Sequence, residues 1–366
     1  MIFCTLFDSN YLDKGLVLLD SLKRLNIDFK LYVLAMNDKC YEVLSDVMKS
    51  NAPEKELLPF SLGTFLEHNK DLAGIKASRT WAEFCWTCTP FLIRYVMEHF
   101  GEQICTYIDS DLYFYADPKC LLDEMGSKSV QIVPHRFSRS AEDRNLQQLS
   151  GTYCVQFNTF KNTPEAMELL NFWCNGCYEC CTSAADSSES KKLGDQAYLE
   201  DWGDKPCVSV LKNPGGGVAP WNVNQYRLKD SKNLILQEKK TCREFGLVFY
   251  HFHYITYLEP KKASINVYGR NFGMDDALIT AIYVPYLEAL DHKKDWLQEN
   301  YGIYPLLMRH PASSGKTANK SNLLDRLRRH KGHILRQVSL RLAIKLKNFC
   351  LSSQRKKNII EIGGHQ

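Results

Sequence analysis

Two carboxylates stand where an apolar run of the sequence stops. The run from Ile104 to Ile108 leads directly to Asp109 and Asp111. A short apolar run is typical of a strand buried in a parallel sheet, and residues two apart on an extended backbone point to the same side. Two adjacent carboxylates need a neutralising charge, and a hard divalent cation such as Mg²⁺ or Mn²⁺ supplies it and holds a diphosphate. The pattern predicts a metal site; the alternative is a pair of solvated loop acids with a capping role.

The elements that would position these carboxylates are those of an α/β fold. The start of the chain alternates strands (2–7, 29–35, 56–60) with helices (14–25, 39–49). This βαβαβ order predicts a parallel sheet with helices on both faces, an arrangement that binds nucleotides at its carboxyl edge. No Gly-x-Gly-x-x-Gly or Walker-type loop is present, which disfavours a dinucleotide or P-loop site. The further elements expected are strands over 104–109, 130–134, 154–160 and 247–253, and helices opened by Thr89-Pro90, Thr163-Pro164 and Gly194-Asp195, with another over 275–301.

Composition narrows the class of protein. The chain has 366 residues, of which 45% are hydrophobic, enough for one large domain or two smaller ones. No apolar run approaches the roughly 18 residues of a transmembrane helix. The segment Met1–Asp8 lacks the basic region of a signal peptide, so a cytoplasmic location is expected. The fourteen cysteines are then expected to be reduced.

Charge is distributed unevenly along the chain. The net charge is +4, but the residues from Gly315 onward hold 13 Lys and Arg against 2 Asp and Glu, which leaves 33 basic and 40 acidic residues in the rest. Over 321–357, apolar residues at helical spacing alternate with basic ones. This pattern predicts a basic amphipathic helix on an anionic membrane surface; the alternative is a solvated helix packed on the body or on a partner. Nucleic-acid binding is disfavoured, because no recognised module is present.

Several short motifs follow one another in a set order over residues 1–255. They are Asp8-Ser9-Asn10-Tyr11, Thr89-Pro90, Tyr107-Ile-Asp-Ser-Asp111, Pro134-His135-Arg136-Phe137, Phe157-Asn158-Thr159-Phe160, Gly194-Asp195-Gln196, Ala219-Pro220-Trp221-Asn222 and Tyr250-His251-Phe252-His253. As a set they resemble bacterial GT-A nucleotide-diphospho-sugar glycosyltransferases, and are similar to glycosyltransferase family eight and its relatives in surface-polysaccharide loci. The resemblance implies a Rossmann-like three-layer α/β sandwich around a mixed, mostly parallel sheet. It implies a transferase domain over 1–255, a helical extension over 256–310, and a linker with the basic tail over 311–366.

The resemblance also implies a metal site. Asp109 and Asp111 match the family's metal-binding pair, and His251 matches its third ligand, for Mn²⁺ or Mg²⁺. His253 lies on the same face of the predicted strand, so the choice between the two histidines stays open. For either histidine the alternative is a hydrogen-bonded core residue.

Other positions match the family's donor and sugar contacts. Asp8, Asn10 and Tyr11 match contacts to the nucleotide, with an ordinary Asx turn as the alternative. The Asp195 and Gln196 pair matches catalytic residues near the transferred sugar; Asp195 alternatively caps a helix. The remaining predicted donor contacts are Asn158, Trp221, Asn222 and, from the chemistry of its guanidinium, Arg79.

The implied activity is transfer of a sugar from a nucleotide-diphosphate sugar, with a UDP-sugar favoured, to a hydroxyl of a glycan or lipid-linked oligosaccharide. Retention of anomeric configuration, a role in surface-polysaccharide synthesis and a peripheral position on the inner face of the membrane are expected with it. Two other classes stay open: a sugar nucleotidyltransferase, which normally has a Gly-rich loop after its first strand, and a non-catalytic glycan-binding protein. The cysteines over 174–181 form a core or interface stripe in a helix, or a metal site.

Overall fold

The structure is a computed structural model that describes residues 1–50, 56–138, 144, 147–148, 150–182, 194–259, 261–265, 274, 276–305 and 359–361. The predicted basic helix over 321–357 lies outside the described residues. The chain forms two compact units. The first contains Met1–His253 together with the helices between residues 276 and 301. The second unit contains a small antiparallel sheet of three strands, which are β13 (Thr256–Glu259), β14 (Lys262–Ser264) and β15 (Ile359–Glu361).

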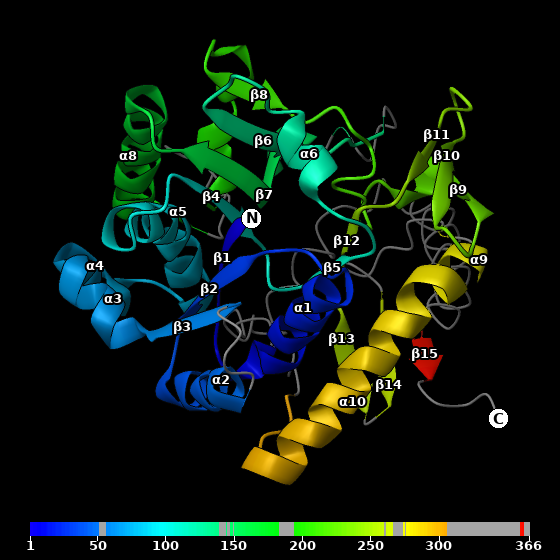
Figure 1. The fold of residues 1–366 in the computed structure, drawn as a ribbon, viewed down its shortest axis with the longest axis horizontal. Helices are drawn as coiled ribbons and strands as arrows, with labels where there is room; N and C mark the ends of the chain where they lie inside the picture. The colour runs from blue at the N-terminus through cyan, green and yellow to red at the C-terminus, as the bar shows by residue number, and fades with distance from the viewer. Residues whose placement is uncertain are drawn as a thin grey trace, which may run out of the picture. The chain divides into compact units, whose positions relative to one another are not determined.

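A seven-stranded sheet forms the centre of the first unit, in the order β3-β2-β1-β4-β7-β6-β8 (Figure 1). Strand β7 runs antiparallel to both of its neighbours, and the other adjacent pairs are parallel. The predicted mixed, mostly parallel sheet is therefore confirmed. Its strands are β1 (Ile2–Phe7), β2 (Lys30–Ala35), β3 (Leu57–Ser61), β4 (Ile104–Ile108), β6 (Val130–Pro134), β7 (Tyr153–Lys161) and β8 (Val208–Val210).

Helices cover both faces of this sheet, because side chains alternate along its strands. Phe3 and Phe7 of β1 belong to one core, and Cys4 and Leu6 belong to the other. The first core is covered by α1 (Leu12–Arg24), α2 (Asp38–Ser50) and α10 (Val284–Tyr301), and Figure 1 shows α10 running alongside α1. The second is covered by α3 (Leu62–His68), α4 (Lys70–Ile75), α5 (Trp81–His99) and α8 (Pro164–Glu179). The three-layer α/β sandwich is confirmed.

One helix begins earlier than its sequence signal predicts. Helix α5 starts at Trp81, eight residues before Thr89, so the predicted start at Thr89-Pro90 is wrong. A capping box starts it instead: the Thr80 hydroxyl accepts from the Glu83 backbone N–H, and the Glu83 carboxylate accepts from the Thr80 N–H. Pro90 then lies inside the helix, where its ring costs one backbone hydrogen bond. Burial of the surrounding apolar residues offsets that cost.

Two smaller features also differ from expectation. The helix expected from Gly194-Asp195 is a short 3-10 turn, η3 (Gln196–Leu199), and the last predicted strand of the main domain is only β12 (Phe249–His251). Strand β12 pairs antiparallel with β5 (Leu112–Phe114), outside the main sheet. The remaining elements are η1 (Ser9–Tyr11), η2 (Lys76–Ser78), α6 (Lys119–Asp123), η4 (Trp202–Asp204), η5 (Val223–Gln225), β9 (Tyr226–Asp230), β10 (Ile235–Glu238), β11 (Glu244–Gly246), α9 (Asp276–Leu278) and the π-helix η6 (Ile279–Tyr283).

The cysteine stripe lies in the core. Cys174 and Cys177 on α8 are fully buried among apolar residues, and Cys181 just beyond the helix is nearly so. The cysteines that the structure describes are free thiols. Within the same part of the chain, no helix is both long and apolar enough to cross a membrane.

Candidate metal and donor site

Asp109 and Asp111 lie at the carboxyl edge of the sheet, directly after β4. The backbone N–H of Asp109 donates to Gln156 O on β7 (3.1 Å), and the carbonyl of Asp111 accepts from the Phe252 N–H (3.0 Å). The β5–β12 pairing places His251 opposite Leu112. Backbone hydrogen bonds thus bring a histidine from late in the chain beside the two aspartates.

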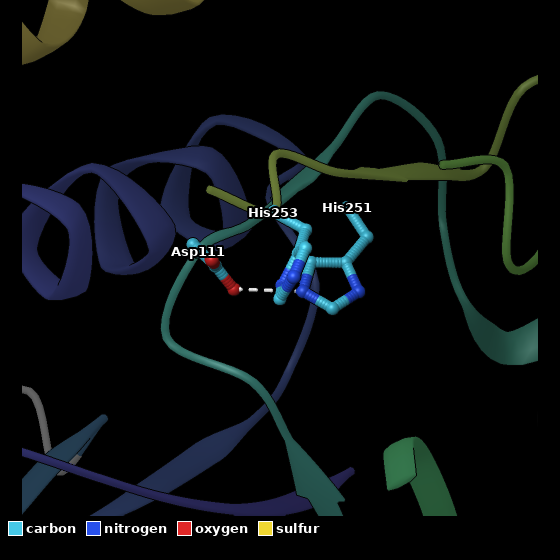
Figure 2. A group of neighbouring side chains, drawn as sticks. All are labelled: Asp111, His251 and His253. Carbon is cyan, nitrogen blue, oxygen red and sulfur yellow. Dashed lines mark ion pairs between the residues drawn. The ribbon is translucent and has the colours of Figure 1, made fainter. Parts of the chain in front are cut away.

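Three side chains converge at this point: Asp111, His251 and His253 (Figure 2). Their candidate ligand atoms all lie within 4.8 Å of one another. His251 Nε2 is 3.0 Å from Asp111 Oδ1 and 3.6 Å from Asp109 Oδ2. The structure therefore groups Asp111 with both candidate histidines, as a candidate metal group, and Asp109 lies beside this group without being part of it. A carboxylate and two imidazoles form a donor set that fits a divalent transition metal.

Gln156 orients the His251 ring. Its Oε1 lies 2.8 Å from His251 Nδ1, and both side chains are buried. An amide oxygen only accepts, so Nδ1 carries the hydrogen and Nε2 faces the carboxylates. Metal-binding histidines are commonly held in this way, by a second partner on the far nitrogen. Sequence reasoning missed Gln156, although it lies two residues before Asn158 on the same strand.

The charges of this group are strongly coupled. Burial alone would raise the pKa of Asp111, but the nearby His251 outweighs it and lowers the pKa to about 2. Burial raises the pKa of Asp109 to about 6, against the attraction of His251. Burial would lower the pKa of His251, but Asp111 raises it well above its ordinary value. Without an ion, the positive charge of protonated His251 offsets the negative charge of the carboxylates. A bound cation would displace that proton and supply the positive charge instead.

His253 is held neutral in the same group. Burial and, second, the charge of His251 lower the pKa of His253 to about 4. A neutral imidazole has a lone pair to offer a metal. The sequence left the choice between His251 and His253 open, and the geometry places both within reach of one ion.

Trp221 packs against the two histidines, and Asn222 holds the backbone beside them. The Trp221 ring packs edge-on against His251 (5.3 Å between centroids) and His253 (5.7 Å), and its Nε1 donates to His135 O (3.0 Å). The Asn222 amide donates to the carbonyls of His135 (2.8 Å) and Gly217 (2.9 Å) and accepts from the Ala219 N–H. Both side chains were predicted as donor contacts. In the structure Trp221 packs on the two histidine rings, and the Asn222 amide forms its hydrogen bonds with backbone groups.

The predicted nucleotide contacts lie at the end of β1, at the same edge of the sheet. Asp8 Oδ1 accepts from the Asn10 N–H (2.9 Å), and Asp8 Oδ2 accepts from Trp81 Nε1 (2.8 Å). The Asx-turn alternative is therefore present, and Asp8 also anchors a tryptophan. Tyr11 is partly buried, and the Lys14 ammonium lies 4.4 Å from its ring centroid.

Asp195 and Gln196 lie at the start of the short helix η3. Asp195 is the N-cap residue of η3, although its side chain makes no capping hydrogen bond of the usual kind. Burial and, second, the charge of Asp109 raise the pKa of Asp195 to about 7. The Asp195 carbonyl accepts from Trp173 Nε1 (2.9 Å), which fixes the backbone here. Gln196 is partly exposed.

Two further predicted donor contacts have different surroundings. The Arg79 guanidinium binds the Thr87 hydroxyl and the carbonyls of Cys177 (2.6 Å) and Tyr178, at the end of α8. Asn158 lies on β7 beside Tyr107 of β4 and is fully buried. Among the described residues, neither end of the Asn158 amide has a hydrogen-bond partner. Arg79 thus anchors a helix end, whereas Asn158 has unused polar atoms beneath the site.

Comparison with known proteins gives two sequence relatives. No protein-family model matches the chain. YfnD of Bacillus subtilis (strain 168), an uncharacterized protein, is 30% identical over 309 residues, which cover 83% of this chain and 92% of YfnD. The chain belongs to the YfnD family. YfnF of the same organism, also uncharacterized, is 30% identical over 257 residues, covering 68% of this chain and 80% of YfnF.

Solved structures similar to this YfnD relative are glycosyltransferases. Galactosyltransferase LgtC in complex with donor and acceptor sugar analogues covers 80% of this chain and 96% of its own, at 13% identity and a TM-score of 0.48. Mouse xyloside xylosyltransferase 1 covers 69% and 98%, at 12% identity and a TM-score of 0.44. The bifunctional glycosyltransferase WbbM covers 80% and 51%, at 15% identity and a TM-score of 0.43. These likenesses are distant.

Proposed function

We propose that this protein is a metal-dependent glycosyltransferase that uses a nucleotide-diphosphate sugar, with a UDP-sugar favoured. The observation that carries the proposal is the Asp111, His251 and His253 group beside Asp109, at the sheet edge that also holds Asp8. Carboxyl edges of parallel strands are where α/β folds bind nucleotides. A metal group at that edge is suited to the diphosphate of a nucleotide sugar.

The residues that would hold the ion are Asp111, His251 and His253, with Asp109 as a further candidate. Two imidazoles favour Mn²⁺ over Mg²⁺, which prefers oxygen ligands. When bound, the cation would neutralise charge on the departing nucleoside diphosphate. Gln156 and Trp221 hold the His251 ring in place for this role.

Asp195 and Gln196 are assigned to the sugar end of the donor. The Asp195 carboxylate would bind sugar hydroxyls, and the Gln196 amide would face the reacting carbon and stabilise positive charge that develops there. Asn158, with its unused amide, would add a contact on the same side. We expect retention of configuration, with a phosphate oxygen of the leaving group taking the proton of the acceptor hydroxyl.

The acceptor proposed is a hydroxyl of a glycan or lipid-linked oligosaccharide in surface-polysaccharide synthesis. The basic segment over 321–357 would hold the enzyme on the inner face of the membrane, at about 1 kcal/mol for each basic residue near the surface. We propose that the chain is divided into a transferase domain over 1–255, a helical extension over 256–310, and a linker with the basic tail over 311–366.

A donor screen tests the activity. UDP and GDP release from a panel of nucleotide sugars, with Mn²⁺ and a mixture of glycan acceptors, is measured for wild type, for Asp111→Asn and for the control Asp123→Asn. Asp123 is an exposed carboxylate on α6, paired with Lys119. We expect release that requires Mn²⁺, is lost in Asp111→Asn and is unchanged in the control. Absence of metal-dependent release with every donor would reject the transferase and favour a glycan-binding role. Pyrophosphate release from a nucleoside triphosphate and a sugar phosphate would indicate a nucleotidyltransferase.

Flotation with liposomes tests the membrane role. The full chain is expected to float with vesicles containing anionic lipid and not with neutral vesicles, and the chain ended at residue 314 is expected to lose that binding. Equal flotation of the two chains would show that the tail is not the membrane contact.

A further inference from the structure

Trp81 combines an exposed ring with a fixed position. It is the first residue of α5 and remains 39% exposed, one of the large side chains left open to solvent on the described surface. Its indole Nε1 donates to Asp8 Oδ2 at 2.8 Å, and Asp8 itself is only 9% exposed. A surface tryptophan needs no explanation by itself, but this one is tied to a nearly buried carboxylate at the end of β1.

The backbone on which Trp81 stands is also fixed. Thr80 and Glu83 close the capping box around the first turn of α5. One residue earlier, the Arg79 guanidinium binds the carbonyls of Cys177 and Tyr178 at the end of α8. A ring held by its own hydrogen bond, on a backbone fixed by the capping box and by Arg79, loses little conformational entropy when a ligand stacks on it.

The ring lies at the nucleotide end of the proposed donor site. Asp8, its partner, accepts from Asn10 and precedes the turn that carries Tyr11. Strands β1 and β4 are parallel neighbours, so the turn that follows β1 and carries Tyr11 lies at the same edge of the sheet as Asp111, which follows β4. A donor with its diphosphate at Asp111 would therefore have its base near Asp8.

Tyr11 is less suited than Trp81 to meet that base. The Lys14 ammonium lies 4.4 Å from the Tyr11 ring centroid, and the residue is partly buried. Trp81 has the larger ring and remains 39% exposed, and the nearest described ammonium, that of Lys76, lies farther from its ring centroid, at 5.6 Å.

We propose that Trp81 is the stacking platform for the nucleobase of the donor, held in place by Asp8. This inference rests on the proposed function, because it takes the donor to be a nucleoside diphosphate sugar. Stacking uses the face of a base, so Trp81 distinguishes a nucleoside diphosphate from a bare diphosphate, and the neighbouring Asn10 is left to contact the edge of the base.

Binding measurements with and without a base test this role. UDP, GDP and inorganic pyrophosphate are titrated in the presence of Mn²⁺ by isothermal calorimetry into wild type, Trp81→Ala, Trp81→Phe and the control Trp296→Phe. Trp296 lies on α10, away from this surface, and packs against Tyr301. Thermal unfolding of each variant reports whether it is folded. If Trp81→Ala is unstable, Trp81→Phe still tests the stacking role, because it replaces the indole with a smaller aromatic ring.

We expect Trp81→Ala to weaken binding of at least one nucleoside diphosphate on the order of 10-fold, the loss typical of one base–aromatic contact. Trp81→Phe should lose less, and pyrophosphate binding should be unchanged in all variants. Unaltered nucleotide affinity in Trp81→Ala, or an equal loss for nucleotide and pyrophosphate, would overturn the stacking role and leave the transferase proposal intact. A wild-type protein that binds pyrophosphate but neither nucleotide would reject both.

Discussion

His251 Nδ1 lies 2.8 Å from Oε1 of Gln156, a residue 95 positions earlier in the chain. This hydrogen bond joins β12 to strand β7 of the main sheet, and Nε2 of the same ring lies 3.0 Å from Asp111 Oδ1. The candidate metal group therefore depends on a side chain that is not one of its candidate ligands.

Gln156→Leu removes this support. We expect Mn²⁺ affinity to fall about 10- to 100-fold, as is usual when a metal-binding histidine loses its second partner. Electron paramagnetic resonance of free Mn²⁺ during a titration measures the change. Gln103→Leu is the control, because the exposed Gln103 side chain donates only to the nearby Gly101 carbonyl among the described residues. Unchanged Mn²⁺ affinity in Gln156→Leu would show that the ring is oriented by packing alone.

His253→Ala tests which ligands the ion uses. The geometry includes His253 with Asp111 and His251, so we expect the variant to bind Mn²⁺ at least about 10-fold more weakly. Loss of an imidazole should also narrow the preference for Mn²⁺ over Mg²⁺, since the remaining ligands are richer in oxygen. Competition titrations measure both quantities. His292→Ala on the exposed side of α10 serves as the control. An unchanged metal preference would point to Asp109 in place of His253.

Gly217→Ala should disturb the same histidine through the backbone. Gly217 has φ +100°, and an added Cβ would lie 2.9 Å from both Val133 Cγ1 and Arg136 Nη1. The next residue, Val218, accepts from the His251 N–H (2.9 Å). We expect a loss of stability above about 1 kcal/mol together with weaker Mn²⁺ binding, measured by urea unfolding and titration. Gly246→Ala, whose added Cβ would have its nearest neighbour at 4.0 Å, is expected to change neither quantity much.

Glu102 should make stability depend on pH. Burial would raise the pKa of Glu102, but hydrogen bonds from Lys30 and Tyr32, each 2.7 Å, outweigh it and lower the pKa. A carboxyl whose folded pKa is lowered adds stability above its unfolded pKa of about 4.3, and that stability is lost as pH falls through the lower, folded value. Glu102→Gln is therefore expected to cost about 1 kcal/mol at pH 7 and less near pH 3.

Urea unfolding at the two pH values measures this difference, with the exposed Glu67→Gln as the control. A cost for Glu102→Gln that is the same at pH 3 and pH 7 would show that the charge of Glu102 does not contribute.

Local sequence signals determined much of the fold. The apolar runs of β1, β2 and β4 and the helical spacing of α1 and α2 predicted the sheet, because side-chain periodicity reflects which faces are buried. The start of α5 was missed because two helix-start signals lie in the same stretch. The capping box at Thr80 prevails over Pro90, whose lost hydrogen bond is offset by burial of that helix in the core.

The sequence by itself also determined that Asp109 and Asp111 follow a buried strand and that histidines recur near residue 251. Only the tertiary structure decided that His253 joins the metal group, that Gln156 orients His251, that the Asn222 and Arg79 side chains bind backbone carbonyls, and that Trp81 is tied to Asp8. The physical reason is that spacing along a strand sets which side chains share a face. Which partner each side chain meets depends on strand pairing and helix packing between segments far apart in sequence.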